Sequence, residues 1–206
     1  MVLLKKLIRI IIDYKFSLLP IVLFELIYLT KGYKGNKFIF SPSKFMHDNI
    51  PCPYYFLSKI KKVLKNNGFN KLIDLGSGSG RSIYFFNQKF KNKNYVGIEF
   101  FSEQYQYCKK LFSENKNIEI INDDFTKNNF FQYNADCYFF NLPFRDDIEC
   151  FKFLDKTINS LISKRNILFI FVNCNNKIID QLKNIQCIDK YYISNIKGYS
   201  IYRLNR

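Results

Sequence analysis

The chain has 206 residues, enough for one ordinary domain with an appendage and too few for a multidomain machine. Its 48% hydrophobic, 18% aromatic and 24% charged residues can build a core, which excludes both a disordered chain and a transmembrane bundle. The 32 Lys and Arg outweigh the 17 Asp and Glu, and the resulting net charge of +15 favours anionic partners.

Residues 1–37 form an apolar and basic segment. The apolar run at 16–30 (FSLLPIVLFELIYLT) is shorter than the roughly 20 residues of a spanning helix, and Glu25 near its middle would be costly in hydrocarbon. Seven basic and two acidic residues give the segment a local charge of +5. This pattern is typical of a segment that lies in a membrane interface, so we predict a membrane-associating unit, with a single span or a helix pair packed on the domain as alternatives.

Prolines punctuate residues 38–52, which we interpret as a linker, and residues 53–206 form the predicted main domain. Apolar positions that recur at intervals of three and four predict a helix over 53–67. Buried strands and helices then alternate along the chain. Strands are expected at 71–75, 94–99, 118–121, 135–140 and 167–172, and helices at 81–90, 103–113, 148–162 and 177–182.

Two further strand-like runs, at 187–193 and 199–204, are joined by turn residues and predict a closing hairpin. The alternation before them is typical of βαβ units. The predicted fold class is therefore α/β, with a doubly wound, seven-stranded and mostly parallel sheet. A C-terminal antiparallel hairpin ends it, and the apolar N-terminal helical segment precedes it.

Six cysteines and one histidine limit the chemistry open to the chain. There is no C-x-x-C pair, and His47 alone leaves no Cys/His quartet, so we expect no metal site. Cys137 and Cys174 lie in or beside apolar runs, which predicts reduced thiols in a reducing compartment. A single histidine also argues against hydrolysis by a catalytic triad.

The strand at 71–75 runs into a glycine-rich turn, in which Gly76, Gly78 and Gly80 alternate with Ser77 and Ser79. Glycines let backbone amides approach a ligand and permit positive φ, so we expect a ligand on this turn. A dinucleotide fingerprint read from Gly76 would need glycine where Arg81 stands, and a phosphate P-loop would need G-K-[ST], which is absent. The turn therefore matches neither of these two motifs.

The pattern Asp74-x-Gly-x-Gly-x-Gly resembles the first motif of the class I S-adenosylmethionine-dependent methyltransferases, and the resemblance extends over about 71–206. It implies S-adenosylmethionine as cofactor. It also implies that Glu99, at the end of the second strand, accepts both ribose hydroxyls. Asp124, preferred to Asp123, would take the adenine amino group. The implied cofactor-binding residues are Asp74, Gly76, Ser77, Gly78, Gly80, Glu99, Phe100, Asp124 and Phe125, the two phenylalanines with packing in the core as an alternative.

The fourth strand ends in Asn141-Leu142-Pro143-Phe144, where the family places residues that face the methyl acceptor. The tetrapeptide resembles the N-P-P-F type of methyltransferases that act on amide or exocyclic amino nitrogens, although Leu142 departs from that pattern. The resemblance makes Asn141, Pro143 and Phe144 the candidate catalytic residues. An ordinary turn that ends the strand is the alternative.

The apolar N-terminal segment, the proline-rich linker and the D-L-G-S-G-x-G-R run also resemble membrane-linked protein-lysine methyltransferases of the ATP synthase c subunit type. This resemblance implies methyl transfer to a nitrogen acceptor, a protein lysine above all, at the cytoplasmic inner face of a membrane. A nucleic-acid or small-molecule methyltransferase and a non-catalytic membrane adaptor with a vestigial fold are the alternatives. Nucleic acid stays open as a partner, although the lysines do not cluster with aromatic residues in any one segment.

Overall fold

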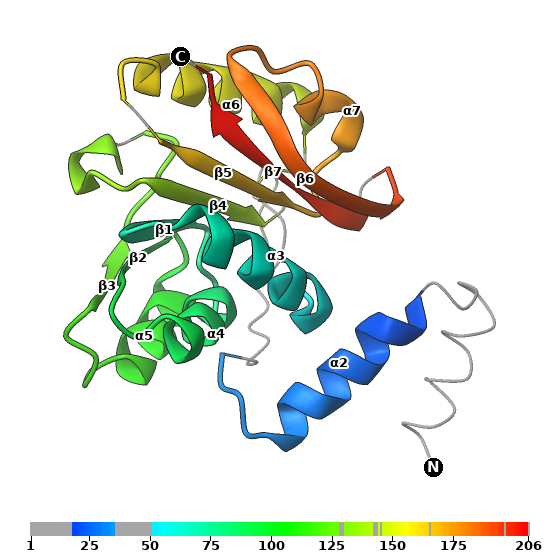
Figure 1. Ribbon diagram of the computed structural model, residues 1–206. Coiled ribbons are helices and arrows are strands. Elements are labelled where there is room, and N and C mark those ends of the chain that lie inside the picture. The colour runs from blue at the N-terminus through cyan, green and yellow to red at the C-terminus, as the bar shows by residue number, and fades with distance from the viewer. Residues whose placement is uncertain are drawn as a thin grey trace.

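The computed structural model describes residues 18–35, 51–127, 130–141, 144, 146–164, 166–195 and 197–205. Its centre is a seven-stranded sheet in the order β3-β2-β1-β4-β5-β7-β6, with helices on both faces (Figure 1). The strands are β1 (Lys71–Leu75), β2 (Asn94–Glu99), β3 (Ile118–Asn122), β4 (Cys137–Asn141), β5 (Leu168–Val172), β6 (Ile185–Ser194) and β7 (Lys197–Leu204).

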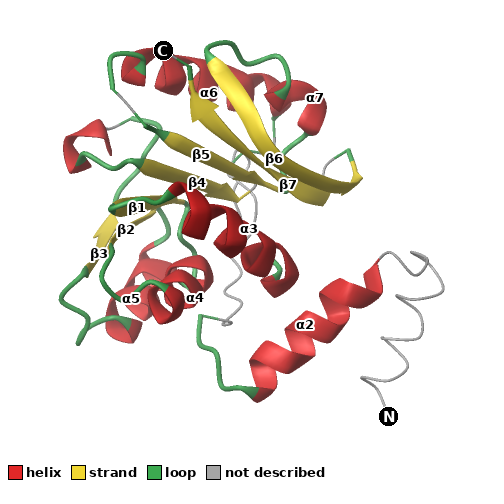
Figure 2. Cartoon of the chain, viewed as in Figure 1, coloured by secondary structure: helices red, strands yellow, loops and turns green. Residues whose placement is uncertain are grey.

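Helices connect most of the strands, as Figure 2 shows. They are α2 (Leu19–Thr30), α3 (Tyr54–Asn67), α4 (Arg81–Lys89), α5 (Ser102–Leu111), the 3-10 helix η2 (Phe130–Tyr133), α6 (Asp147–Leu161) and α7 (Asn176–Ile179). Strands β1 to β5 pair in parallel, whereas β7 pairs antiparallel with both β5 and β6. The predicted fold class, with its mostly parallel sheet, closing hairpin and preceding N-terminal helix, is confirmed.

Side chains that alternate along each strand divide the core between the two faces of the sheet. Leu72 of β1 packs in a cluster with α3, α4 and α5, and the next residue, Ile73, packs in a second cluster with α6 and α7. Both clusters are rich in phenylalanine and tyrosine. Parallel strands covered on both faces must be apolar throughout, which is why the short apolar runs of the sequence locate them.

Helix α2 packs beside α3, with one face buried and another face exposed. Ile21 is buried on the inner face, where the ring of Tyr28 stacks on Tyr54 at 4.8 Å between centroids. Leu23 and Ile27, on the outer face, are 47% and 44% exposed. Within the described residues, no helix has the length and apolar character that crossing a membrane requires. Residues 1–17 and 36–50, with His47, lie outside the described residues, so the boundaries at 37 and 52 stay predictions.

All six cysteines are described, and each is a free thiol. Five are buried, and only Cys187, on the outer strand β6, is exposed. Burial raises the pKa of Cys108 and Cys137, which favours the neutral thiol. These side chains therefore act as small apolar groups of the core.

Candidate active site

The glycine-rich turn leaves β1 at Leu75 and enters α4 at Arg81. Gly76 has φ +86°, which is the left-handed region that glycine occupies without strain. The amides of Gly76 and Ser77 donate to the carbonyl of Ile98 at 2.9 and 3.0 Å. These two hydrogen bonds fix the turn to the end of β2. The turn is the segment on which the sequence predicts a ligand.

Gly80, the last glycine of the turn, has a second reason to lack a side chain. Its φ is +81°, and a Cβ there would lie 2.7 Å from both Cys108 Sγ and a Phe112 ring carbon. Both neighbours belong to α5 or its C-terminal cap. The glycine therefore allows α4 to begin in close contact with α5.

Asp74 lies in β1 and is 1% exposed. Its Oδ2 accepts a hydrogen bond from the Ser82 hydroxyl on α4, whereas its Oδ1 is buried with no hydrogen-bond partner among the described residues. Burial raises the pKa of Asp74 to about 7, the Ser82 hydrogen bond acts against this, and the nearby Glu99 adds to the rise. A buried acceptor of this kind fits a hydrogen-bond donor or a cation supplied by a ligand.

Glu99 ends β2 and is 4% exposed. Its Oε2 accepts from the Gly78 amide at 2.7 Å, and its Oε1 accepts from the Phe101 amide at 2.9 Å. Burial raises the pKa of Glu99, and these backbone hydrogen bonds oppose the rise. A carboxylate offers about four lone-pair positions, so each oxygen can still accept one more hydrogen bond, as two ribose hydroxyls would require.

Asp124 and Phe125 follow β3 at the same edge of the sheet. Oδ1 of Asp124 accepts from the amide and hydroxyl of Thr126, at 3.0 and 2.5 Å, and Oδ2 lies 3.2 Å from Lys127 Nζ. Partial burial acts to raise the pKa of Asp124, but the hydrogen bonds from Thr126 and Lys127 outweigh it and hold the pKa below its ordinary value. Asp124 is therefore ionised and tied to its own turn.

The two phenylalanines predicted to pack on the cofactor differ in position. Phe125 is buried, and a Cβ on Gly76 would lie 3.9 Å from its ring, so it borders the glycine-rich turn. Phe100 is 47% exposed and contacts Phe101 edge-to-face. The structure thus gathers Asp74, the turn, Glu99 and Phe125, with Phe100 at the surface beside them.

Of the predicted acceptor residues, Asn141 ends β4 and Phe144 follows it. Asn173, which follows β5, donates its side-chain N–H to Oδ1 of Asn141 at 2.9 Å. The ring of Phe144 lies edge-on to Phe125, 6.0 Å between centroids, and packs on Phe153 of α6. The predicted acceptor and cofactor residues therefore adjoin. Pro143 lies outside the described residues.

Sequence reasoning missed three partners of these residues: Ser82 beside Asp74, Asn173 beside Asn141, and Glu25, which pairs with Arg81. Ser82 stands two residues after Gly80, in the first turn of α4, and could have been found there. Glu25 was noted only as a charge within an apolar run, although such a charge is itself a sign of a buried partner. Asn173 carries no sequence signal, because only the sheet brings β5 beside β4.

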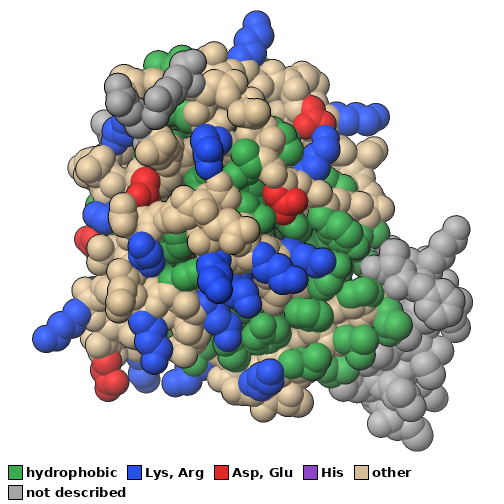
Figure 3. Space-filling view, viewed as in Figure 1, with side chains coloured by type: hydrophobic (Ala, Val, Ile, Leu, Met, Phe, Trp, Pro, Cys, Tyr) green, Lys and Arg blue, Asp and Glu red, His purple; other side chains and the backbone are tan. Residues whose placement is uncertain are grey.

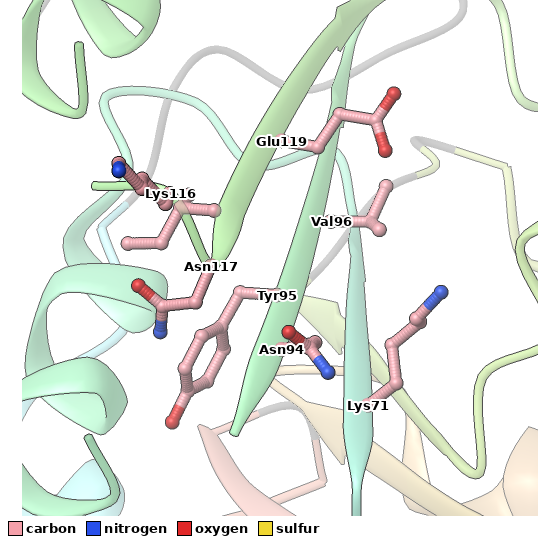
Figure 4. Close-up of a pocket in the computed structure, with 8 residues that line it drawn as sticks. Lys71, Asn94, Tyr95, Val96, Lys116, Asn117 and Glu119 are labelled. Atoms are coloured by element: carbon pink, nitrogen blue, oxygen red, sulfur yellow. The ribbon is translucent and has the colours of Figure 1, made fainter. Parts of the chain in front are cut away.

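A pocket of about 270 Å³ lies away from these residues, near the amino ends of β1, β2 and β3 (Figure 4). The described part of the connection between β3 and β4 contains only η2 in place of a full helix. Lys71 Nζ is held by the carbonyl of Tyr133 at 2.9 Å, and Asn117 Nδ2 by Asn87 Oδ1 at 2.9 Å. Because these polar groups already have partners, we interpret the pocket as a recess of the fold.

Comparisons with known proteins find methyltransferases. Residues 72–165 match a family model described as a methyltransferase domain. A structure of a S-adenosylmethionine-dependent methyltransferase from Clostridium acetobutylicum is similar at 16% identity and a TM-score of 0.56, over 73% of this chain and 91% of that one. Fibrillarin from Aeropyrum pernix, with S-adenosyl-L-methionine bound, is similar at 12% identity and 0.53, over 66% of each chain.

Human N-acetylserotonin methyltransferase in complex with SAM is also similar, at 14% identity and a TM-score of 0.53, over 74% of this chain and 55% of that one. No curated protein matches the sequence. At these identities the structures show the shared fold. The methyltransferase-domain match and the fold together support an enzyme that uses S-adenosylmethionine.

The side chains present fit that cofactor. S-adenosylmethionine carries a sulfonium and an ammonium group, and the site offers two buried carboxylates, Asp74 and Glu99, in a chain that is otherwise strongly basic. The buried Oδ1 of Asp74 is an acceptor for an ammonium or hydroxyl donor. Glu99 has the acceptor capacity for a ribose, and the turn has no side chain at Gly76 to block a close approach.

Proposed function

We propose that this enzyme transfers a methyl group from S-adenosylmethionine to a nitrogen acceptor, and that the acceptor is the side-chain amine of a protein lysine. The contact between Phe125 and Phe144 carries the proposal, because it joins the cofactor edge to the end of the strand that carries Asn141. The resemblance of residues 141–144 to N-P-P-F tetrapeptides supports nitrogen rather than oxygen. The fold itself is neutral on the acceptor.

The cofactor supplies a methyl group on a cationic sulfur, which is a good leaving group, so the protein mainly has to align the acceptor. Asp74 and Glu99 would hold the donor, and alignment of this kind is worth up to about 7 to 11 kcal/mol. The lone pair of a neutral amine attacks the methyl carbon while the carbon–sulfur bond breaks and its electrons remain on sulfur. The methylated amine then loses a proton to water.

Asn141 would orient the acceptor. Its side chain is held by a hydrogen bond from Asn173 at 2.9 Å, at the end of the strand that leads to Phe144. An amine must be neutral to react, and a site between Phe144 and Phe125 would favour the neutral form by removing water.

Charge near the acceptor residues supports a cationic polypeptide as substrate. Asp146 and Asp147 are exposed at the start of α6, close in sequence to Phe144, and Glu149, which is also exposed, pairs with Lys152 at 2.9 Å. Ile148, between them, is 64% exposed. In a chain with 17 acidic and 32 basic residues, such a grouping would attract a lysine-bearing segment rather than an anion.

The test is incubation of the protein with S-adenosylmethionine labelled in the methyl group and with cell fractions. We expect label in protein, recovered as methyl-lysine after acid hydrolysis. Asn141→Ala should lower the rate about ten to a hundredfold with unchanged cofactor affinity. Asn159→Ala, the same change at an exposed position of α6, serves as the control.

Other outcomes identify the alternatives. Label in RNA or DNA, with an affinity that falls steeply as salt rises, would indicate a nucleic-acid methyltransferase. Label in small molecules would indicate a small-molecule enzyme. No binding of S-adenosylmethionine by calorimetry would favour a non-catalytic membrane adaptor.

We also propose that the protein is cytoplasmic and that the outer face of α2 binds the inner face of a membrane. Leu23, Ile27 and Leu29 are each 44–47% exposed, and Lys31 and Lys34 are exposed just after the helix. Figure 3 shows hydrophobic side chains gathered at the lower right, where Figure 1 places α2, with lysine and arginine side chains beside them. An apolar face beside cations suits an anionic lipid surface.

A further inference from the structure

Glu25 of α2 contacts the residue that follows the glycine-rich turn. Its Oε2 lies 2.9 Å from Nη1 of Arg81, which is the first residue of α4. Its Oε1 accepts from the backbone amide of Tyr54 at 2.8 Å, so the same carboxylate also binds the first residue of α3. Three elements that are distant in sequence therefore meet at one side chain.

The ion pair lies largely out of the solvent. The side chains of Arg81 and Glu25 are 10% and 26% exposed. The guanidinium lies 4.6 Å from the ring centroid of Tyr54, and its Nη1 also donates to the carbonyl of Cys52 at 3.3 Å. Removal of the charge at Glu25 would leave a half-compensated guanidinium in this environment, which favours movement of Arg81 toward water.

A second contact ties the chain after α2 to the same turn. The Ser79 hydroxyl donates to the carbonyl of Gly35 at 2.5 Å. Gly35 has φ +79°, and a Cβ there would lie 2.6 Å from Cα and N of Arg81. The backbone of Gly35 therefore packs directly against the backbone of Arg81. Ser79 and Arg81 flank Gly80, which means that both contacts fix the end of the turn.

The middle of the turn contacts the predicted ribose-binding residue, Glu99. The amide of Gly78 donates to Glu99 at 2.7 Å, one residue before Ser79. A displacement of Ser79 and Arg81 would move this amide and release Glu99 from its position.

We propose that Glu25 is a positioning residue for the cofactor site: through Arg81, and together with the Gly35–Ser79 contact, it holds the glycine-rich turn in the conformation that binds S-adenosylmethionine. Ligand affinity is gained when a loop is held beforehand in its bound conformation, because less order is lost on binding. Helix α2 then contributes to cofactor binding through Arg81 and the turn. The proposal rests on S-adenosylmethionine as the ligand of the turn.

The test uses the full chain with Glu25→Gln, which removes the charge and preserves the shape. Glu103→Gln, an exposed acid in the first turn of α5, is the matched control. We expect calorimetry to show S-adenosylmethionine bound about five to twentyfold more weakly by Glu25→Gln and unchanged by Glu103→Gln. Arg81→Gln should weaken binding similarly, and the double variant should be little worse than either single one, as for two residues that act as a pair.

Amide hydrogen exchange without cofactor separates positioning from general stability. In Glu25→Gln we expect faster exchange at residues 76–82 and unchanged exchange in β4 and β5. If Glu25→Gln does not fold, Ser79→Ala, which removes only the Gly35 contact, should give the same pattern with a two to fivefold loss of affinity. Wild-type affinity in folded Glu25→Gln, or faster exchange throughout the sheet, would overturn the proposal. If the unaltered protein binds no S-adenosylmethionine, the cofactor assignment fails instead, and exchange at 76–82 still decides whether Glu25 positions the turn.

Discussion

The amide of Gly78 donates to Oε2 of Glu99 across 2.7 Å, so the turn that follows β1 and the acid that ends β2 are joined by one hydrogen bond. A ligand that binds both residues meets a preformed surface. The remaining acceptor capacity of Glu99 faces no competition from a side chain at Gly78. The roles of these residues can be tested singly.

Glu99→Gln should weaken the binding of S-adenosylmethionine by about 2 kcal/mol, which is tens of fold, because two charge-assisted hydrogen bonds become neutral ones. Isothermal calorimetry measures this. Glu119→Gln, at an exposed position of β3, is the control and should bind as the unaltered protein does. An unchanged affinity in Glu99→Gln would refute the ribose role.

Asp74→Asn should stabilise the cofactor-free protein, and more so at high pH. Burial, above all, raises the pKa of Asp74 in the folded protein to about 7 from an ordinary 3.8. The cost of ionising it is therefore absent below about pH 4, grows as the pH rises toward 7 and then stays constant, at up to about 4 kcal/mol at about 1.4 kcal/mol per pKa unit.

Calorimetric melting of both proteins checks the direction of this pH dependence. The gain of Asp74→Asn in free energy of unfolding should be larger at pH 8 than at pH 5, while its affinity for S-adenosylmethionine falls. An equal gain at both values of pH would show that Asp74 does not titrate between them.

Gly80→Ala should destabilise the protein by about 2 to 4 kcal/mol, because it adds a Cβ against Cys108 and Phe112 to the strain of a positive φ. Gly32→Ala is a matched control: its φ is +69°, but no atom lies within 4 Å of the added Cβ. Its cost should be only the backbone strain of about 1 to 2 kcal/mol. Urea unfolding measures both, and equal costs would mean that α5 gives way to the new methyl group.

Leu23→Gln with Ile27→Gln should weaken sedimentation with phosphatidylglycerol vesicles by about tenfold or more, since each half-exposed side chain contributes about 1 kcal/mol of apolar burial. Ile148→Gln changes an equally apolar exposed residue on α6 and should sediment as before. Vesicle binding that survives the change in α2 would assign the membrane contact elsewhere or to charge alone.

The sequence predicts the central strands closely, because an apolar run that ends in glycine or an acid has sharp limits. The predicted strands at 71–75 and 94–99 agree with β1 and β2 residue for residue. Strand β6 was predicted at 187–193 and extends over 185–194, since an edge strand with a bulge near Cys187 loses the alternation that locates it. The helix predicted at 177–182 is the single turn α7, capped by Asn175.

Some residues of the candidate site could likewise be located from the sequence, and others could not. Acids at the ends of successive parallel strands must meet at one edge of the sheet, so the position of Asp74, Glu99 and Asp124 at that edge could be predicted from the sequence. Asn173 and Glu25 could not, because their partners depend on packing between elements far apart in the chain. That Asp124 takes the adenine amino group stays a prediction.

The carboxylates buried at the end of β1 and β2 have a further consequence for the protein in the cell. A ligand that binds only the folded chain stabilises it by about 2.7 kcal/mol when present at a hundred times its dissociation constant. This gain depends only on the free ligand concentration and the dissociation constant, and it offsets the cost of burying the Asp74 charge. The amount of this protein that escapes proteolysis would thus follow the supply of the methyl donor, so that starvation for the donor lowers the number of enzyme molecules as well as their turnover.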